Sequence, residues 1–252
     1  MKYLIQFSFK LICILFLQIL APATAQQISP LISKEDQTNP PWRFVGFPKS
    51  KANIPATLFE VAEIQGQNAI KVSTQASYGT WVHDLPNVVA GKLQWRWRLD
   101  SALNGGKTPP DIMNKAGDDA ALKICVIFDH SLSQVPFVER TILKIARSMS
   151  GEDLPAATIC YIWDSVYTAG LQAANPYTKR VRFITLQGKG SALGQWRTES
   201  RDLAVDFELL FADELPSNHK SNPTRVKAVL IGADSDNTGA RSTAWVSEIN
   251  WK

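Results

Sequence analysis

The chain has 252 residues, 45% of them hydrophobic, and carries 27 lysine and arginine residues against 23 acidic ones. A charge this close to balance excludes a non-specific nucleic-acid binder, which needs a strongly basic surface. The length and the apolar fraction are typical of one β-rich domain that buries a full core.

The first 25 residues have the pattern of a signal peptide. Lys2 and Lys10 supply positive charge, and the apolar run at 11–20 is too short to span a bilayer. Small residues follow at 23–25, at the spacing that signal peptidase recognises. We therefore expect export to the periplasm or the cell exterior, cleavage before Gln26, and a mature chain that does not span the membrane.

Residues 26–41 are polar and lack periodicity, so we expect a flexible N-terminal arm followed by a single domain at 42–252. The clearest strand pattern is at 93–100, where alternate residues are apolar and lie on one face. The segments with strand character are 42–47, 56–62, 68–74, 79–85, 93–100, 123–129, 158–164, 180–187, 225–233 and 243–251.

One segment has helical spacing instead. Between Pro136 and Gly151, the apolar residues Phe137, Val138, Ile142, Ile145, Ala146 and Met149 recur at intervals of three and four. A second short helix is compatible with 206–215. Short strands with one inserted α-helix predict a mainly β fold, an antiparallel jelly-roll-like β-sandwich, because a parallel α/β sheet would need a helix after nearly every strand.

Two cysteines remain after the signal peptide, Cys125 and Cys160, each within a predicted strand. In an exported protein such a pair can form a disulfide, provided that the two strands are close neighbours. The sequence equally allows two buried thiols that act as small apolar side chains.

The stretch "DSDNTG" at 234–239 resembles the start of a calcium loop, with Asp234 and Asp236 as ligands. An EF-hand is excluded because its twelfth position needs a carboxylate and is Trp245 here, and because both flanks are strands. A looser structural Ca²⁺ site at Asp234 and Asp236, an ordinary β-turn, and direct ligand contact by Asn237 and its neighbours all stay open.

Other polar residues gather in predicted loops and at strand ends, where binding residues are common. The candidates for ligand binding are Asp118, Asp119, Asn175, Tyr177, Arg201 and Asp202, together with Trp196. Carboxylates from Asp118, Asp119, Asp202 and Asp206 could instead supply an acid–base pair for glycoside cleavage, or form salt bridges. We assign no catalytic residue and, apart from the Ca²⁺ alternative, no cofactor.

Eight tryptophans are present. Five of them lie on strand faces with other apolar residues and are expected in the core. Trp42, Trp81 and Trp196 stand near polar or glycine-rich neighbours and are candidates for platforms on which a sugar could stack, although core packing is the favoured interpretation for any single tryptophan.

The succession of "LQWRWRLD", "GDDAALKICVIFD", "ICYIWDS", "NPYTKRVRFITLQ", "WRTESRDLAVDF" and "IGADSDNTGARSTAWVSEI" resembles the bacterial exported family called domain of unknown function 3047. The resemblance covers roughly residues 42–251 and implies an envelope-located, β-sandwich-like domain. Members more often carry an aromatic residue after the aspartate pair, where this chain has Ala120 and Ala121.

These patterns support three hypotheses. The first is a non-catalytic, carbohydrate-binding-like module of the envelope, with a glycan or envelope polysaccharide as partner. The second is a glycoside hydrolase or lyase that uses an aspartate pair. The third is an envelope assembly partner that binds protein, for which a large exposed apolar patch would be the sign.

Overall fold

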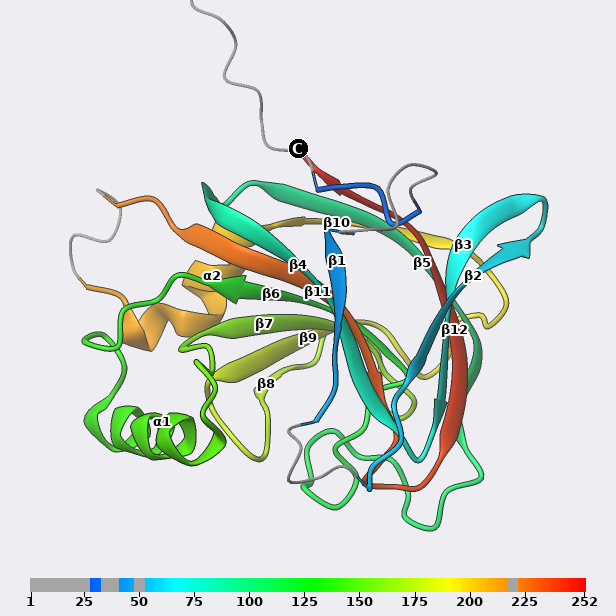
Figure 1. Cartoon of the computed structure of the whole chain (residues 1–252), viewed down its shortest axis with the longest axis horizontal. Coiled ribbons are helices and arrows are strands. Elements are labelled where there is room, and N and C mark those ends of the chain that lie inside the picture. The colour runs from blue at the N-terminus through cyan, green and yellow to red at the C-terminus, as the bar shows by residue number, and fades with distance from the viewer. Residues whose placement is uncertain (1–27, 33–40, 48–52, 217–221) are drawn as a thin grey trace, which may run out of the picture.

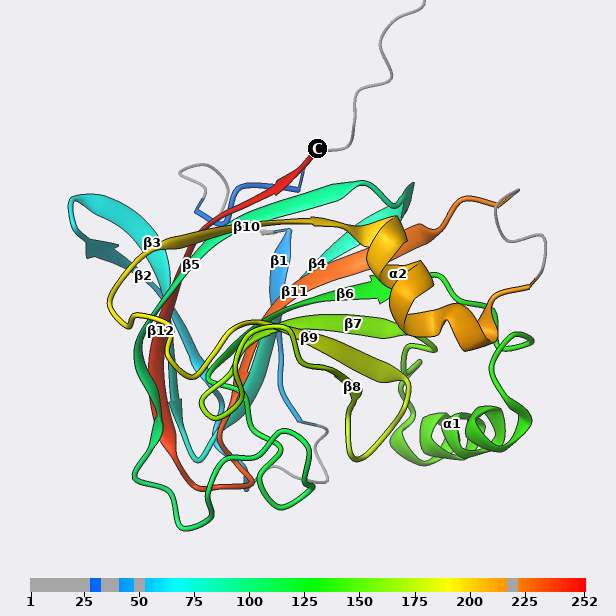
Figure 2. The ribbon, with the colours of Figure 1, turned by 180° about the vertical axis from the view of Figure 1, so that it is seen from behind.

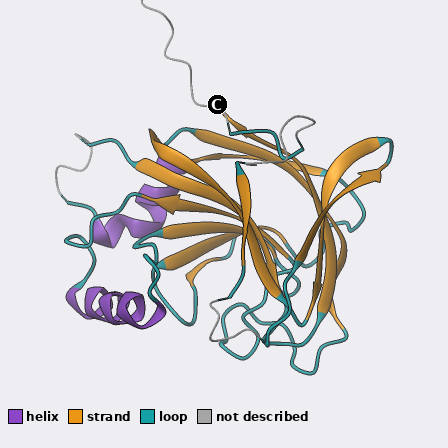
Figure 3. Cartoon of the chain, in the orientation of Figure 1, coloured by secondary structure: helices purple, strands orange, loops and turns teal. Residues whose placement is uncertain are grey.

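The structure is a computed structural model that describes residues 28–32, 41–47, 53–216 and 222–252. The predicted signal peptide at 1–25 lies outside the described residues. Two β-sheets pack against each other, and two helices lie together at one margin of the molecule (Figure 1, Figure 3). The fold is the mainly β sandwich that the sequence predicts.

The first sheet has seven strands, and one neighbouring pair of them is parallel. All its neighbouring strands are antiparallel except β7 and β9, because the chain passes to the sheet edge as β8 before it returns as β9. In spatial order the strands are β1 (Trp42–Val45), β4 (Tyr78–Val89), β11 (Arg225–Asp234), β6 (Leu122–Phe128), β7 (Thr158–Trp163), β9 (Val181–Gln187) and β8 (Gln172–Ala174).

The second sheet has five strands, all antiparallel. Its spatial order is β10 (Arg197–Asp202), β5 (Lys92–Asn104), β12 (Arg241–Trp251), β3 (Gln67–Gln75) and β2 (Leu58–Ile64). All ten predicted strand segments are present. The two strands without a predicted counterpart are β8, which has only three residues, and β10, whose sequence RTESRD contains no apolar residue.

The core lies between the two sheets and is rich in aromatic side chains. The four apolar residues of the alternating stretch in β5 are all 0% exposed. The ring of Trp95 lies 5.1 Å from that of Tyr161, and the ring of Trp97 lies 5.5 Å from that of Trp163. These contacts join β5 of one sheet to β7 of the other, and aromatic pairs of this kind stabilise beyond the area they bury.

Residues 28–32 fall within the predicted N-terminal arm, yet they pack against the domain. Ile28 and Leu31 are 6% and 8% exposed. The indole Nε1 of Trp42 donates a hydrogen bond to the carbonyl oxygen of Ser29 at 3.0 Å. Trp42 is itself only 3% exposed, so of the two interpretations that the sequence allows it is a core residue and not a sugar platform.

Both expected helical segments are present. Helix α1 (Phe137–Ser150) connects β6 to β7 and ends at Gly151, whose φ of 71° is the left-handed conformation that favours glycine. Helix α2 (Leu203–Phe211) follows β10 and continues as a short 3₁₀ turn, η2 (Ala212–Glu214). Asp202 caps α2, because its side chain accepts hydrogen bonds from the N–H groups of Ala204 and Val205.

Candidate functional site

Three loops that are distant in sequence are tied together beside the first sheet: 105–121 before β6, 175–180 before β9, and 235–240 after β11. Asp119 is the main link. Its carboxylate accepts hydrogen bonds from the N–H groups of Asn237 at 3.2 Å and Thr238 at 2.7 Å, and from the Thr238 hydroxyl at 2.6 Å. Since Asp119 is 2% exposed, its carboxylate fixes the turn after β11 and is not free to bind a ligand.

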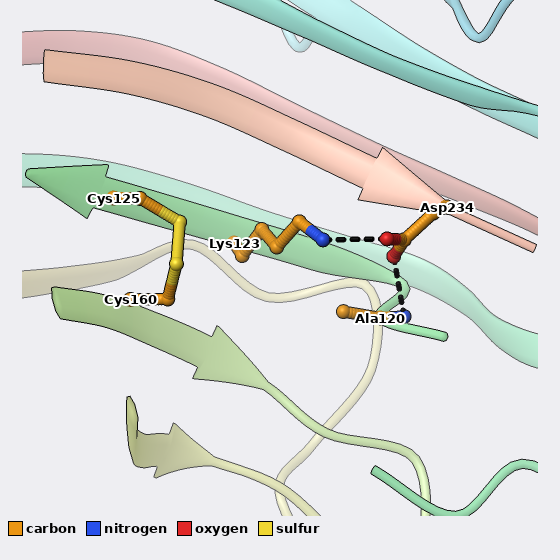
Figure 4. Close-up of a disulfide and its surroundings, with 5 residues drawn as sticks. All are labelled: Ala120, Lys123, Cys125, Cys160 and Asp234. Atoms are coloured by element: carbon orange, nitrogen blue, oxygen red, sulfur yellow. Dashed lines mark hydrogen bonds and ion pairs between the residues drawn. A yellow bond between two sulfur atoms is a disulfide. The ribbon is translucent and has the colours of Figure 1, made fainter. Parts of the chain in front are cut away.

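Asp234 is the last residue of β11 and is held by the start of β6 (Figure 4). One of its oxygens accepts a hydrogen bond from the Ala120 N–H at 2.7 Å, and the other pairs with Lys123 Nζ at 2.6 Å. The N–H of Gly239 donates to the carbonyl oxygen of Ser235 at 2.9 Å and closes the turn. The stretch "DSDNTG" is therefore a turn whose first carboxylate already has a cationic partner.

This pairing disfavours the Ca²⁺ alternative at Asp234 and Asp236. A divalent cation would have to compete with the Lys123 ammonium for the same carboxylate. Among the residues that the structure describes, no group of three or more His, Cys, Asp or Glu side chains is arranged to hold a metal ion.

Next to this rigid network lies an exposed aromatic side chain surrounded by polar groups. Tyr177 is 58% exposed, and its hydroxyl donates to the carbonyl oxygen of Lys115 at 2.8 Å. The same carbonyl accepts from Asn237 Nδ2 at 2.9 Å, and Asn175 Nδ2 donates to Asp118 Oδ2 at 2.6 Å. The Lys115 ammonium lies 5.4 Å from the centre of the Tyr177 ring. We call these five residues the Tyr177 surface.

Burial shifts the carboxyl pKa values at this site. Desolvation, supported by the charges of Asp234 and Asp119, raises the pKa of Asp118 to about 6 although Lys123 and Asn175 oppose it. Desolvation and the same two charges raise the pKa of Asp236 to about 6. Near neutral pH, each of these carboxyl groups therefore exchanges readily between a form that donates a hydrogen bond and one that only accepts.

Lys123 supplies the positive charge beneath the acidic groups. Burial alone would lower its pKa, but the carboxylate of Asp234 and the phenol of Tyr78 outweigh burial, and the net pKa is raised. Lys123 therefore stays charged and keeps its ion pair with Asp234.

A groove of about 680 Å³ adjoins the Tyr177 surface. One wall consists of residues 174–181, including Asn175 and Tyr177, and the other includes Val138, Ile142 and Ala146 of α1. The volume is in the range of clefts that hold small ligands. A smaller cavity of about 250 Å³ near His130 and Phe207 contains none of the predicted binding residues.

Three predicted binding residues lie in β10 of the second sheet or directly before it instead. Arg201 pairs through its guanidinium with Asp206, whose carboxylate also accepts from the Tyr161 hydroxyl at 2.6 Å. Asp202 caps α2. Trp196 stacks beneath the Arg96 guanidinium, 4.9 Å from the ring centre. The structure thus gives Arg201 and Asp202 architectural roles, and it places none of these residues in the Tyr177 surface.

Lys115 and Lys123 were not identified from the sequence. Lys123 lies within a predicted strand, and its partner Asp234 is 111 residues away along the chain. Lys115 contributes mainly its carbonyl oxygen, which carries no sequence signal. Only strand pairing, which brings the start of β6 beside the end of β11, reveals either residue.

The disulfide lies on the same sheet. Cys125 and Cys160 face each other in the register of β6 and β7, with their Cα atoms 4.0 Å apart, and their sulfurs are bonded (Figure 4). They pack with Ile112 and Ala120 of the loop 105–121 in a small apolar cluster. The cross-link thus joins β6 to β7 at the point where the loop 105–121 packs on the sheet.

The motifs of this chain match a family model along most of its length. The model describes "Protein of unknown function (DUF3047)" and matches residues 40–250. The chain belongs to this family. No curated protein matches the chain.

Several solved structures resemble this member of the DUF3047 family in fold. The family 11 carbohydrate-binding module from Clostridium thermocellum, in complex with a β-1,3-1,4-mixed-linked tetrasaccharide, is 11% identical, with a TM-score of 0.39 over 89% of this chain and 94% of that one. The glycoside hydrolase domain of Endo-D from Streptococcus pneumoniae R6 is 11% identical, with a TM-score of 0.31 over 83% of this chain and 21% of that one. The K2 cleaved adhesin domain of Lys-gingipain is 8% identical, with a TM-score of 0.33 over 84% and 89%.

Proposed function

We propose that this protein is a non-catalytic, exported module that binds a glycan at the Tyr177 surface and the adjoining groove. One observation carries the proposal: a 58% exposed tyrosine ring is held among amide and carboxyl groups at the wall of a 680 Å³ groove.

Sugars present C–H faces that pack on aromatic rings and hydroxyl groups that need directed hydrogen bonds. Tyr177 offers the ring, while Asn175 and Asn237 offer amide groups and Asp118 a carboxyl group beside it. Because these side chains bond to one another and to the backbone, they are positioned before a ligand arrives. Preorganisation of this kind lowers the entropic cost of binding.

A binding role agrees better with the carboxylates than a hydrolytic one. Of the four aspartates considered for an acid–base pair, Asp119 is saturated by Thr238 and backbone N–H groups. Asp206 pairs with Arg201, and Asp202 caps α2. None of the other three aspartates is therefore free to form an acid–base pair with Asp118.

Export is part of the proposal and rests on the sequence at 1–25. The disulfide between Cys125 and Cys160 supports it, because such bonds persist mainly in oxidising compartments. Mass spectrometry of the protein recovered from the periplasm or medium should give a chain that begins at Gln26. A chain that retains residues 1–25 would contradict cleavage.

The binding claim is tested by affinity electrophoresis of residues 26–252 in gels that contain mixed-linkage β-glucan, xylan, chitosan or soluble peptidoglycan. We expect at least one polymer to retard the protein, Tyr177→Ala to abolish the retardation, and Leu193→Ala, an exposed loop control, to leave it unchanged. Release of reducing sugar from the retarding polymer would contradict a non-catalytic role. Failure of every polymer to retard the protein would contradict the glycan proposal.

A further inference from the structure

Helix α1 exposes the apolar residues that its sequence places at helical spacing. Met149 is 84% exposed, and the side chains of Phe137, Val138, Ile142 and Ile145 are between 54% and 73% exposed. We call these five residues the α1 stripe. Figures 1 and 2 show α1 at the margin of the molecule, apart from both sheets. An exposed apolar set of this size on one helix marks an interaction surface.

Four of the five residues form one continuous face of the helix, and Phe137 lies about 80° to one side of it. At about 100° per residue, Val138, Ile142, Ile145 and Met149 fall within about 60° of one another. The helix attaches to the domain by its other side, where Leu143 is 5% exposed and packs in a small cluster with Val135. Ile145 and Met149 therefore face away from the domain, whereas Val138 and Ile142 also line the groove beside residues 174–181.

The unpaired charges beside the stripe are basic. Lys144 lies about 20° beyond Phe137 around the helix axis, and the Arg140 guanidinium lies 5.8 Å from the centre of the Phe137 ring. Neither Lys144 nor Arg140 forms an ion pair with an acidic residue among the residues that the structure describes. Glu139 is the only acidic residue of the helix and lies at the other edge of the stripe, about 60° beyond Ile142 around the helix axis. Its charge is neutralised there by Arg180 at 2.5 Å and Lys179 at 3.4 Å. An apolar stripe with cationic residues beside it is complementary to an anionic lipid surface.

The size of the stripe distinguishes a lipid surface from a second copy of the chain. A helix of 14 residues offers a face of roughly 20 Å by 10 Å. A stable protein–protein interface buries about 800 Å² on each partner, several times that face. A helix that lies in a bilayer interface needs only to sink its apolar side chains about 5–10 Å. Among the described residues no helix is long and apolar enough to cross a bilayer. With 14 residues α1 is about 21 Å long, shorter than the hydrocarbon core, and its apolar face suits a position along the bilayer surface.

We propose that α1 docks this protein on an anionic lipid bilayer, with the α1 stripe in the headgroup region and Arg140 and Lys144 against lipid phosphates. This docking is a property separate from glycan binding. Val138 and Ile142 also line the groove, whereas Ile145 and Met149 do not. Substitutions at the latter two therefore test the bilayer contact without altering the groove.

The test is flotation of residues 26–252 with vesicles of phosphatidylethanolamine, with and without phosphatidylglycerol. The wild type should float only with the anionic vesicles, and added salt should release it. Ile145→Glu and Met149→Glu should each reduce partitioning about tenfold or more, because each places a charge where an apolar side chain was buried in lipid. Lys144→Glu should reduce it about tenfold.

The matched control is Leu209→Glu, the same kind of change at a 51% exposed leucine of α2, which should float as the wild type does. Tyr177→Ala should also float normally, which separates this proposal from the glycan proposal. A wild type that stays at the bottom of the gradient with anionic vesicles overturns the proposal. So does sedimentation velocity that shows a dimer which Ile145→Glu dissociates, because the stripe would then bind a second copy.

Discussion

Asp119 and Thr238 are 119 residues apart in the chain, and the Asp119 carboxylate accepts both the N–H and the hydroxyl of Thr238, at 2.7 and 2.6 Å. This contact fastens the loop before β6 to the turn after β11. Asn237, one residue before Thr238, reaches the carbonyl oxygen of Lys115, to which the Tyr177 hydroxyl also bonds. The geometry of the exposed ring therefore depends on a buried carboxylate.

Asp119→Asn should destabilise the protein by about 1–3 kcal/mol, because an amide cannot accept all of these hydrogen bonds. Thr238→Val should cost a similar amount, and the double variant should cost less than the sum since both remove the same contact. Urea unfolding of the wild type and the three variants measures these changes in the free energy of unfolding. Strict additivity of the two single changes would show that Asp119 and Thr238 are not coupled.

The pKa of Asp118, raised to about 6, predicts a pH-dependent effect of Asp118→Asn. A raised carboxyl pKa means that the folded protein holds the proton more tightly than the unfolded chain does. The stability that this adds is complete below the usual pKa near 4 and is lost as the pH rises through 6. The variant avoids that loss. Relative to wild type, its stability should rise by about 1 kcal/mol between pH 4 and pH 7.5, after allowance for solvent screening. A difference that is constant with pH would contradict the raised pKa.

The disulfide between Cys125 and Cys160 closes a segment of 35 residues that includes α1. Loop-closure entropy predicts a stabilisation of about 3–4 kcal/mol for this length. Reduction of the wild type should therefore lower its urea midpoint, while the double variant Cys125→Ala, Cys160→Ala should be less stable and insensitive to reductant. An unchanged midpoint on reduction would mean that the bridge does not constrain the unfolded chain.

Glu214 is the centre of a buried ionic group at the end of α2. Its carboxylate, whose side chain is 0% exposed, accepts from Arg180 at 2.5 Å, Arg182 at 2.5 Å and His130 at 3.0 Å. Burial alone would raise its pKa, but the hydrogen bonds from Arg180 and His130 and the two guanidinium charges outweigh burial and lower the pKa to about 2. A lowered carboxyl pKa gives stability that is present above pH 4.5 and is lost as pH falls through 2.

Glu214→Gln should therefore destabilise the protein by about 3–5 kcal/mol at pH 7, because it removes the buried carboxylate that Arg180 and Arg182 share and leaves Arg180 with Glu139 alone. The loss should shrink as the pH falls toward 2, where the wild type loses the same charge. Urea midpoints at pH 7 and pH 3 check the direction. A loss that grows on acidification would contradict the ion-pair role.

Alternation and periodicity predicted most of the fold. The pattern at 93–100 needs no tertiary information, since its apolar residues must share a face, and all four are buried. The same reasoning failed for β10, which pairs along β5 through its backbone and has no apolar residue to reveal it. Periodicity also identified α1, but it specifies only that a helix has an apolar face and not what covers that face.

Local sequence likewise pointed to some residues of the Tyr177 surface but could not show how they assemble. Asp118, Asn175, Tyr177 and Asn237 were selected as loop residues, and the strand order brings their loops together. Arg201 and Asp202 have the same local character, yet β10 lies at the edge of the other sheet. The sequence does not show which loops lie side by side, because this depends on strand pairings such as that of β11 with β6.

The most direct measurement is isothermal titration of the retarding polysaccharide into wild type, Tyr177→Phe and Tyr177→Ala. Phenylalanine keeps the ring and loses the hydroxyl, with its bond to the Lys115 carbonyl and the longer bond from Asn237 Nδ2 at 3.5 Å, whereas alanine removes the stacking face. We predict that Tyr177→Phe binds within about tenfold of wild type and that Tyr177→Ala shows no measurable binding. Equal binding by Tyr177→Ala and wild type would contradict a glycan site at the Tyr177 surface.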